Sequence, residues 1–257
     1  MSKKTFTLKV FRSHSEEGQY WESFDLELTP GLNVISALME VQKNPVNSAG
    51  VRVAPIAWEQ GCLEEVCGSC SMLVNGRPRQ ACTAIIALIL KKTNSREVTL
   101  APLTKFVLVR DLVVDRQVMF ENLKKVKGWV SADGSFTEGF GPKISQKAQE
   151  INYELSTCMT CGCCSEACPQ VSANSKFMGP APVSQVRLFN NHPTGKADKT
   201  ERLHSMMSEE GVISCGNAQN CVRVCPKDIA LTESIAVLGR DITKQSAKEI
   251  FGIGDRE

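Results

Sequence analysis

The fold of the N-terminal half is decided by the stretch Cys62-Leu-Glu-Glu-Val-Cys67-Gly-Ser-Cys70, together with Cys82 twelve positions further on. The residues between the last two cysteines of the stretch are small, so the backbone can turn closely around them. Residues 71–76 alternate as a strand would and end in Asn-Gly, the dipeptide that favours a tight hairpin turn. Such a hairpin returns the chain to Cys82 and predicts that all four cysteines share one site.

Thiolate sulfur is the soft ligand that iron–sulfur clusters require. A Cys-x4-Cys-x2-Cys run followed by one distant cysteine is the spacing of plant-type 2Fe-2S ferredoxins. We therefore predict that a 2Fe-2S cluster is held by Cys62, Cys67, Cys70 and Cys82. A structural zinc site also uses four cysteines, but it usually pairs two short Cys-x-x-Cys knuckles, and that pattern is missing here.

The rest of this region reads as strands with one crossing helix. Residues 5–10, 20–28 and 98–103 have the pattern of strands, and residues 32–41 have helical spacing. Strands, one helix and a cysteine-bearing loop indicate a β-grasp ferredoxin domain. Residues 111–126 also have the apolar spacing of a helix.

Two further cysteine groups follow, and they form an internal repeat. The second is Cys158-x2-Cys161-x2-Cys164-x3-Cys168-Pro, and the third is Cys215 with Cys221-x3-Cys225-Pro. The second is the run of bacterial two-cluster ferredoxins, in which the fourth cysteine of each run crosses to the other cluster. This rule predicts a 4Fe-4S cluster held by Cys158, Cys161, Cys164 and Cys225.

The other cluster lacks one ligand. Cys168 crosses over to join Cys215 and Cys221, but the position where a fourth cysteine belongs is Ala218. An iron without a thiolate is easily lost, so we predict a 3Fe-4S cluster. Cys163 is then left over: it is a small buried thiol beside the cluster, or it replaces Cys164 as ligand, and the x2 spacing favours Cys164.

Composition limits the class of protein. The 257 residues carry 30 basic and 28 acidic side chains, so no basic excess is available for nucleic acid. The N-terminal residues contain no apolar segment of a secretory signal, and the longest apolar run is too short to span a bilayer. We expect reduced thiols that bind metal, and membrane association only through a partner.

Domain boundaries follow from these patterns. We predict an α+β chain with a β-grasp 2Fe-2S domain and its following helix over residues 1–130. Residues 131–150, rich in Gly, Ser and charge, read as a connector. Residues 151–257 change to short helices between cysteine loops, and we predict an all-α two-cluster ferredoxin-like domain there.

Four motifs carry a family resemblance, in this order: Cys62-Leu-Glu-Glu-Val-Cys67-Gly-Ser-Cys70, Cys158-Met-Thr-Cys161-Gly-Cys163-Cys164-Ser-Glu-Ala-Cys168-Pro169, Lys176-Phe-Met-Gly-Pro180 and Cys221-Val-Arg-Val-Cys225-Pro226-Lys227. With them the chain resembles, over essentially its whole length, the iron–sulfur subunit of succinate dehydrogenase and fumarate reductase, the succinate:quinone oxidoreductases.

The resemblance implies the partners of this chain. A flavoprotein subunit with covalent FAD would oxidise succinate to fumarate, as part of the tricarboxylic acid cycle and the respiratory chain. Electrons would then pass through the 2Fe-2S, 4Fe-4S and 3Fe-4S clusters to a cytochrome b-type membrane anchor that binds quinone and haem. This chain would carry electrons, supply no catalytic residue and bind no dicarboxylate. It would lie at the cytoplasmic face of the cell membrane, held there by its partners.

One departure from the ubiquinone-type members concerns the quinone. Those members have a Trp shortly after the proline equivalent to Pro169 and a His after the cysteine equivalent to Cys215. Here residues 170–174 contain no Trp, and Gly216 follows Cys215. The resemblance therefore points to the menaquinone branch. Two alternatives stay within this class, the fumarate-reducing direction in anaerobic respiration and the iron–sulfur subunit of another flavin oxidoreductase, and a free soluble electron carrier lies outside it.

Overall fold

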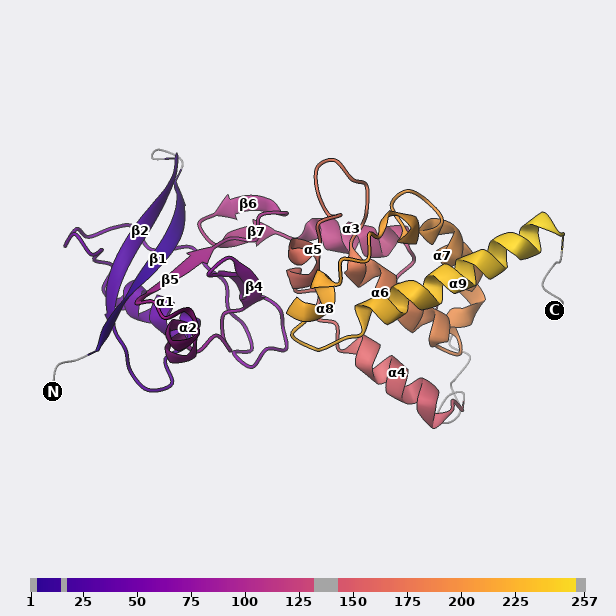
Figure 1. The fold of residues 1–257 in the computed structure, drawn as a ribbon, viewed down its shortest axis with the longest axis horizontal. Helices are drawn as coiled ribbons and strands as arrows, with labels where there is room; N and C mark the ends of the chain where they lie inside the picture. The colour runs from indigo at the N-terminus through magenta and orange to yellow at the C-terminus, as the bar shows by residue number, and fades with distance from the viewer. Residues whose placement is uncertain (1–3, 15–17, 132–142, 253–257) are drawn as a thin grey trace. The chain divides into compact units, whose positions relative to one another are not determined.

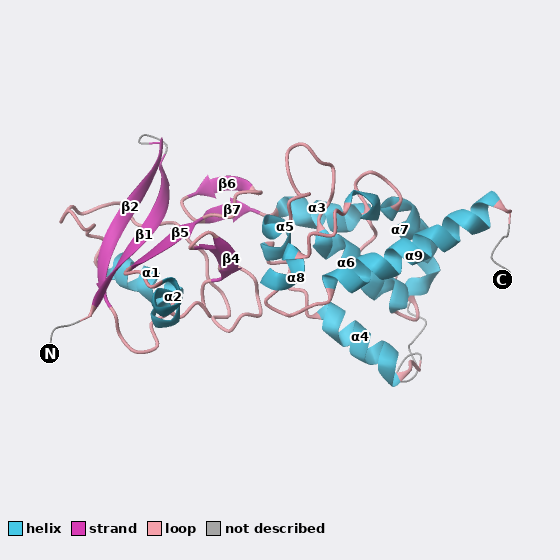
Figure 2. Ribbon diagram, viewed as in Figure 1, coloured by secondary structure: helices cyan, strands magenta, loops and turns pink. Residues whose placement is uncertain are grey.

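The computed structural model describes residues 4–14, 18–131 and 143–252 (Figures 1 and 2). The chain divides into two compact units. The first consists of Met1–Arg116 and the short segment Cys161–Ala167, and the second of Gln117–Thr160 and Cys168–Glu257. The sequence-based boundaries at residues 130 and 150 stay predictions; residues 132–142 of the predicted connector lie outside the described residues.

The first unit is built on a five-stranded sheet with the strand order β2-β1-β5-β3-β4. β1 pairs antiparallel with β2 and parallel with β5 (Figure 2). A mixed sheet with a helix crossing between its hairpins is the β-grasp arrangement, so the predicted fold is confirmed. The elements of the sheet and its helices are β1 Thr5–His14, β2 Gly18–Glu27, α1 Val34–Lys43, β3 Ser71–Val74, β4 Arg77–Gln80, α2 Ile86–Thr93 and β5 Glu97–Ala101.

The core of this unit follows from alternation along β1 and from one face of α1. Phe6, Leu8 and Val10 are buried, as the period of two in a half-buried strand requires. α1 begins at an N-cap, Asn33, whose side chain accepts a hydrogen bond from the Ser36 N–H at 2.8 Å. The buried positions of α1 recur at helical spacing and are Val34, Ile35, Ala37, Leu38 and Val41.

The β3–β4 hairpin turns at Asn75 and Gly76, as predicted. Both residues have positive φ, 48° and 73°, which is what a two-residue type I′ turn needs. The register places Ser71 opposite Gln80, and the N–H of Ala81 donates to the carbonyl of Cys70 at 3.1 Å. The hairpin thus brings the end of β4, and Cys82 after it, back to the first cysteine loop.

The helix predicted over residues 111–126 is wrong at its start. Residues 111–116 form the turn and second strand of a small hairpin, β6 Val107–Arg110 with β7 Val113–Asp115, and α3 spans only Gln117–Lys125. The physical reason is Asp111, which has a positive φ of 46°. Its carboxylate accepts hydrogen bonds from the N–H groups of Ser13 and Ala57, both at 2.8 Å, so contacts distant in sequence decide its conformation.

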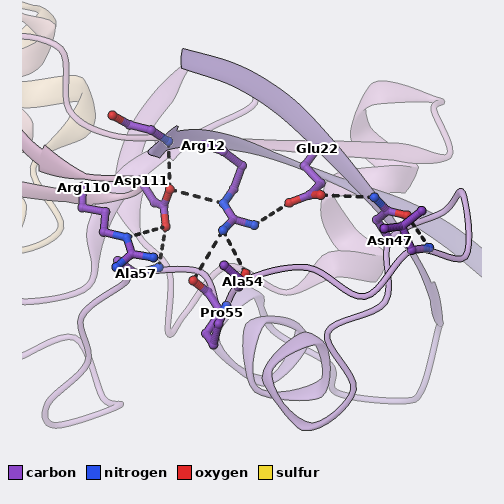
Figure 3. A network of polar contacts seen from close by, with 10 residues as sticks. Arg12, Glu22, Asn47, Ala54, Pro55, Ala57, Arg110 and Asp111 are labelled. Carbon is purple, nitrogen blue, oxygen red and sulfur yellow. Dashed lines mark hydrogen bonds and ion pairs between the residues drawn. The ribbon is translucent and has the colours of Figure 1, made fainter. Parts of the chain in front are cut away.

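Arg12 is the centre of a buried polar network in the first unit (Figure 3). Its guanidinium donates to Glu22 Oε2 at 2.5 Å and to Asp111 Oδ1 at 3.2 Å, and only 1 % of its surface is exposed. It also donates to the backbone carbonyl of Ala54 at 2.9 Å. A buried cation is tolerated because its partners are charged and its N–H groups are used. The network fixes the loop that leads into the first cysteine stretch.

The second unit is helical. Its helices are α3, α4 Gln146–Ser156, α6 Pro180–Asn191, α7 Lys199–Met206, α8 Asn220–Val224 and α9 Leu231–Ile250, with short 3-10 turns at Gly195–Asp198 and Val212–Ser214. Apolar side chains from several of these elements form its core: Val126, Phe177, Met178, Val183, Val186, Leu203, Met206 and Leu238.

Two arginines, Arg187 and Arg202, are buried among the described residues of this second unit, and Arg202 is the more completely buried. Arg202 is 0 % exposed and donates to the carbonyls of Lys127, Trp129 and Gly195 at 2.8, 2.8 and 2.5 Å. Burial lowers the pKa of Arg202 from its usual value. Over the described ranges, the chain contains no helix long and apolar enough to cross a membrane.

Candidate iron–sulfur sites

The first cysteine loop points its backbone N–H groups at sulfur. Cys62 Sγ accepts from the N–H groups of Glu64, Val66 and Cys67, at 3.4, 3.2 and 3.3 Å. Two non-glycine residues of the loop have positive φ, Leu63 at 63° and Glu65 at 59°. This conformation costs a non-glycine residue about 1–2 kcal/mol. N–H groups converging on one sulfur stabilise negative charge there, which suits a thiolate ligand.

Cys67 lies within the same set of contacts. Its pKa is lowered to about 6, chiefly by a hydrogen bond from the Ser69 side chain and then by the backbone of Cys62. The Cys62 N–H donates to Cys67 Sγ at 3.4 Å. Gly61 allows this close approach, because a Cβ atom there would lie 2.8 Å from the Cys67 sulfur. The loop therefore favours the thiolate form of Cys67.

Cys70 and Cys82 form the buried side of the site. Each is 4 % exposed, and burial is the main cause that raises the pKa of Cys70 to about 11, with Cys82 as a close neighbour. A buried thiol of this kind ionises when it coordinates a metal, which supplies the positive charge its surroundings lack. One exposed ligand, Cys67, one half-buried ligand, Cys62, and two buried ones fit a cluster at the edge of the unit. All four predicted 2Fe-2S ligands come from this loop and the end of the β3–β4 hairpin.

The second cysteine group divides between the two units. Cys161 and Cys164 belong to the segment Cys161–Ala167 of the first unit, and Cys158 and Cys225 belong to the second. The pKa of Cys161 is lowered to about 7, first by a hydrogen bond from Cys163. The structure thus describes the two halves of the predicted 4Fe-4S ligand set separately, and the set stays a prediction.

The segment Cys161–Ala167 is anchored to the first unit by several contacts. Glu166 accepts from the Thr104 hydroxyl at 2.6 Å and from the N–H of Lys105 at 3.0 Å. Gly162 has a φ of 88°, and a Cβ atom there would meet the Phe106 ring at 2.9 Å. Only glycine therefore fits this position, between two predicted cluster ligands.

Arg116 bonds the same segment to the first cysteine loop. Its guanidinium donates to the carbonyl of Gly68 at 2.6 Å and to that of Cys161 at 3.5 Å, and it pairs with Glu59 at 3.3 Å. The nearby charge of Arg116 contributes to lowering the pKa of Cys161. Sequence reasoning missed Arg116 and Glu166, because neither has a cysteine-like spacing and both act through contacts distant in sequence.

The third site lies wholly in the second unit. Cys168, Cys215 and Cys221 line one hollow of about 320 Å³, space open to solvent included, and Ala218 lines it too. Burial raises the pKa of Cys221, and the neighbouring Cys168 and Cys215 sulfurs raise it further. The N–H of Asn217 donates to Cys215 Sγ at 3.4 Å. Three sulfurs and one methyl group around a hollow fit a cluster that has three thiolate ligands.

The described residues include all twelve cysteines, and no disulfide joins any two of them. No three Cys, His, Asp or Glu side chains of the described residues converge on the position of a single metal ion.

Two families match, one for each half of the chain. Residues 7–121 match the family described as a 2Fe-2S iron-sulfur cluster binding domain, and residues 154–229 match the 4Fe-4S dicluster domain. With the β-grasp sheet, the helical second unit and the cysteine sites, these matches define an iron–sulfur electron-transfer protein with two cluster-binding domains.

Relatives that match nearly the whole chain identify the family within this class of iron–sulfur proteins. The chain is 52 % identical to the succinate dehydrogenase iron-sulfur subunit of Bacillus subtilis, over 97 % of both chains. It is 27 % identical to the fumarate reductase iron-sulfur subunit of Wolinella succinogenes, covering 92 % of this chain and 97 % of that one. The chain belongs to the family of succinate dehydrogenase and fumarate reductase iron–sulfur subunits, and it is therefore a subunit of an oxidoreductase complex.

A solved structure supports the fold. The model superposes on a chain of the Mycobacterium smegmatis Sdh1 complex in the apo form with a TM-score of 0.79. The match covers 95 % of this chain and 98 % of that one at 23 % identity. The predicted order of a β-grasp domain followed by a helical ferredoxin-like domain is thus confirmed.

Proposed function

We propose that this chain relays electrons within a succinate:quinone oxidoreductase. Electrons from covalent FAD on a flavoprotein subunit pass through 2Fe-2S, 4Fe-4S and 3Fe-4S clusters to a cytochrome b-type membrane anchor, its haem and its quinone. The observation that carries the proposal is the order of the three cysteine groups along a chain of this family. This chain lies at the cytoplasmic face of the cell membrane, held there by its partner subunits.

The ligand assignment is part of the proposal. Cys62, Cys67, Cys70 and Cys82 hold the 2Fe-2S cluster, and Cys158, Cys161, Cys164 and Cys225 the 4Fe-4S cluster. Cys168, Cys215 and Cys221 hold the 3Fe-4S cluster beside Ala218, which lines the same hollow. When bound, these clusters supply the one-electron chemistry.

The chain's own residues act by holding and stabilising charge. The N–H groups that point at Cys62 Sγ stabilise the negative charge of a ligand sulfur, and that charge grows when an electron arrives. Burial of Cys70 and Cys82 keeps water away from one side of the first site. No side chain of this chain needs to exchange a proton with the dicarboxylate.

We propose menaquinone as the quinone. The support is the segment after Pro169, which has no Trp, and Gly216 in the place of a His after Cys215. Gly216 and Gln170 both line the hollow of the third site. A Cβ atom on residue 216 would lie 2.7 Å from the Gln170 side-chain nitrogen, so a larger residue there would have to displace Gln170.

The direction of the reaction is a separate matter. Fumarate reductase subunits are among the relatives, including one from Escherichia coli O157:H7 that is 34 % identical over 68 % of this chain. The higher identity to a succinate dehydrogenase subunit supports succinate oxidation as the working direction.

The test is low-temperature EPR on the complex purified anaerobically with its native partners, first as isolated and then reduced with succinate. We expect a 3Fe-4S signal in the oxidised sample and a 2Fe-2S signal after succinate. Succinate-dependent reduction of a menaquinone analogue, faster than that of a ubiquinone analogue, would support the menaquinone branch. A colourless preparation containing zinc would overturn the relay, and elution of this chain alone would favour a free carrier.

A further inference from the structure

Gln80 has a fully buried amide that reaches two cysteine sulfurs. It ends β4, and 0 % of its surface is exposed. In the structure its Oε1 accepts from Cys70 Sγ at 3.5 Å, and its Nε2 faces Cys163 Sγ at 3.6 Å. Nε2 also donates to the Ser71 hydroxyl at 2.8 Å, and that hydroxyl donates to the carbonyl of Gly68 at 2.7 Å. One amide thus connects the first cysteine loop to the segment Cys161–Ala167.

The two sulfurs differ in their predicted roles. Cys70 is a ligand of the 2Fe-2S cluster, whereas Cys163 is the cysteine left over after all three ligand sets are filled. Cys163 is 0 % exposed, and its Sγ lies 3.6 Å from Gln80 Nε2. Because Cys163 belongs to none of the predicted ligand sets, no iron takes the place of its proton, and its S–H group can donate.

The Gln80 amide can form a hydrogen bond with Cys70 both when Cys70 is a thiol and when it is a thiolate ligand. A Cys70 thiolate has no proton, so it accepts hydrogen bonds and no longer donates to Oε1. The oxygen and nitrogen of an amide are nearly equal in size, so a half-turn of the Gln80 amide places Nε2 toward Cys70 and Oε1 toward the Cys163 thiol. The Ser71 hydroxyl accepts from Nε2 in the first arrangement. After the half-turn it donates to Oε1 in place of the Gly68 carbonyl.

The Gln80 amide affects the reduction potential of the 2Fe-2S cluster. A buried amide left without partners is costly, so both ends of Gln80 must stay bonded when the Cys70 sulfur is a cluster ligand. A donor to a ligand sulfur stabilises the reduced cluster, which carries more negative charge, and thereby raises the reduction potential. The amide's other end bonds a segment that carries two predicted 4Fe-4S ligands, Cys161 and Cys164.

We propose that Gln80 is a positioning residue that serves both of the first two clusters. It donates to the Cys70 sulfur and so raises the potential of the 2Fe-2S centre. Through Cys163 it fixes the segment Cys161–Ala167 against the first cysteine loop. One electron passes from the first centre to the second, and neither Gln80 nor Cys163 gains or loses a proton. This inference rests on the proposed electron relay.

The test is an EPR-monitored redox titration of the whole complex with Gln80→Leu, which keeps the apolar bulk and removes the amide. We expect the 2Fe-2S midpoint to shift to lower potential, while the 3Fe-4S midpoint stays unchanged. The matched control is Gln185→Leu, in the second unit, where the amide donates to the Leu155 carbonyl at 3.4 Å. The control should move neither midpoint.

A second variant keeps the inference testable if Gln80→Leu fails to assemble. Cys163→Ala removes the far partner of the amide and leaves all predicted ligands in place, so we expect a smaller shift of the 2Fe-2S midpoint in the same direction. Cys163→Ser, whose hydroxyl still donates, should restore the midpoint. An unchanged midpoint in Gln80→Leu, with only the unfolding temperature lowered, would reduce Gln80 to a packing role and overturn the inference. Absence of a 2Fe-2S signal from the unaltered complex would instead overturn the proposed relay itself.

Discussion

The ligands of the first and the third cluster sites are brought together in different ways. Cys62 and Cys67 lie in one continuous loop whose own backbone N–H groups point at sulfur, and a tight hairpin brings Cys82 to them. The third site joins Cys168, which belongs to the second cysteine group, to Cys215 and Cys221 around a hollow, so its ligands come from segments far apart in sequence. The first site, whose ligands are close in sequence, is held by hydrogen bonds within its own loop. The third site, whose ligands are distant in sequence, leaves an open space beside Ala218.

The largest expected effect is loss of one cluster at a time. Cys62→Ala should abolish the 2Fe-2S EPR signal and leave the 3Fe-4S signal, because the two ligand sets share no cysteine. Cys221→Ala should do the reverse. Iron content and EPR of the purified complex measure both. If either substitution removed both signals, the two sites would not be independent and the comparison would fail.

A substitution at Ala218 can add the fourth thiolate ligand that the third site lacks. Ala218→Cys should convert the 3Fe-4S centre into a 4Fe-4S centre, because a fourth thiolate can retain the fourth iron. The converted centre should have a lower potential, since an added thiolate increases its negative charge. EPR in the oxidised state is the measurement: the 3Fe-4S signal should disappear without loss of iron. Asn217→Cys, one position away, is the matched control, and a signal lost there as well would show that the corner is not specific to residue 218.

The contribution of the buried polar network to the first unit can be tested at Arg12. Arg12→Met leaves Glu22 and Asp111 buried without the Arg12 cation, and Asp111 keeps only the more distant cation, Arg110, at 3.8 Å. This costs about 3–5 kcal/mol of unfolding free energy. The unfolding temperature of the complex should fall by roughly 10 °C. Differential scanning calorimetry checks this. Lys43→Met, which breaks the exposed Lys43–Glu40 pair, should cost under about 1 kcal/mol and serves as control. Equal losses in both variants would contradict the importance of burial.

The smallest expected effect concerns Cys163. Cys163→Ser should leave all three cluster signals intact, because the serine hydroxyl occupies the same buried position and Cys164 is the predicted ligand. The measurement is EPR together with iron and sulfide content. Loss of the 4Fe-4S signal would identify Cys163 as the ligand in place of Cys164.

Local patterns in the sequence predicted much of this fold. The alternation of Phe6, Leu8 and Val10, the Asn75-Gly76 turn and the helical spacing of residues 32–41 each depend on neighbours in sequence, and the structure has a strand, a turn and a helix there. The helix predicted from residue 111 failed because Asp111 is fixed by partners about a hundred residues and fifty residues away.

The candidate sites divide in the same way. Cysteine spacing was enough to propose every ligand. The roles of Gln80 and Arg116 could not be predicted from the sequence. A single glutamine or arginine has no characteristic spacing, and its role depends on the residues that fold against it. The β6–β7 hairpin was likewise not predicted, since no strand was proposed for residues 107–110 and residues 111–115 were assigned to the predicted helix.

The composition of the first unit bears on how the protein is made. A ribosome delivers Met1–Arg116 well before Cys161–Ala167, the segment that completes the same unit. Until that segment emerges, Gln80 lacks its Cys163 partner and Phe106 lacks the glycine that packs on its ring. A fragment that ends at residue 130 would therefore expose the surface that Cys161–Ala167 covers in the whole chain. A fragment designed to isolate the β-grasp domain should retain or replace those seven residues.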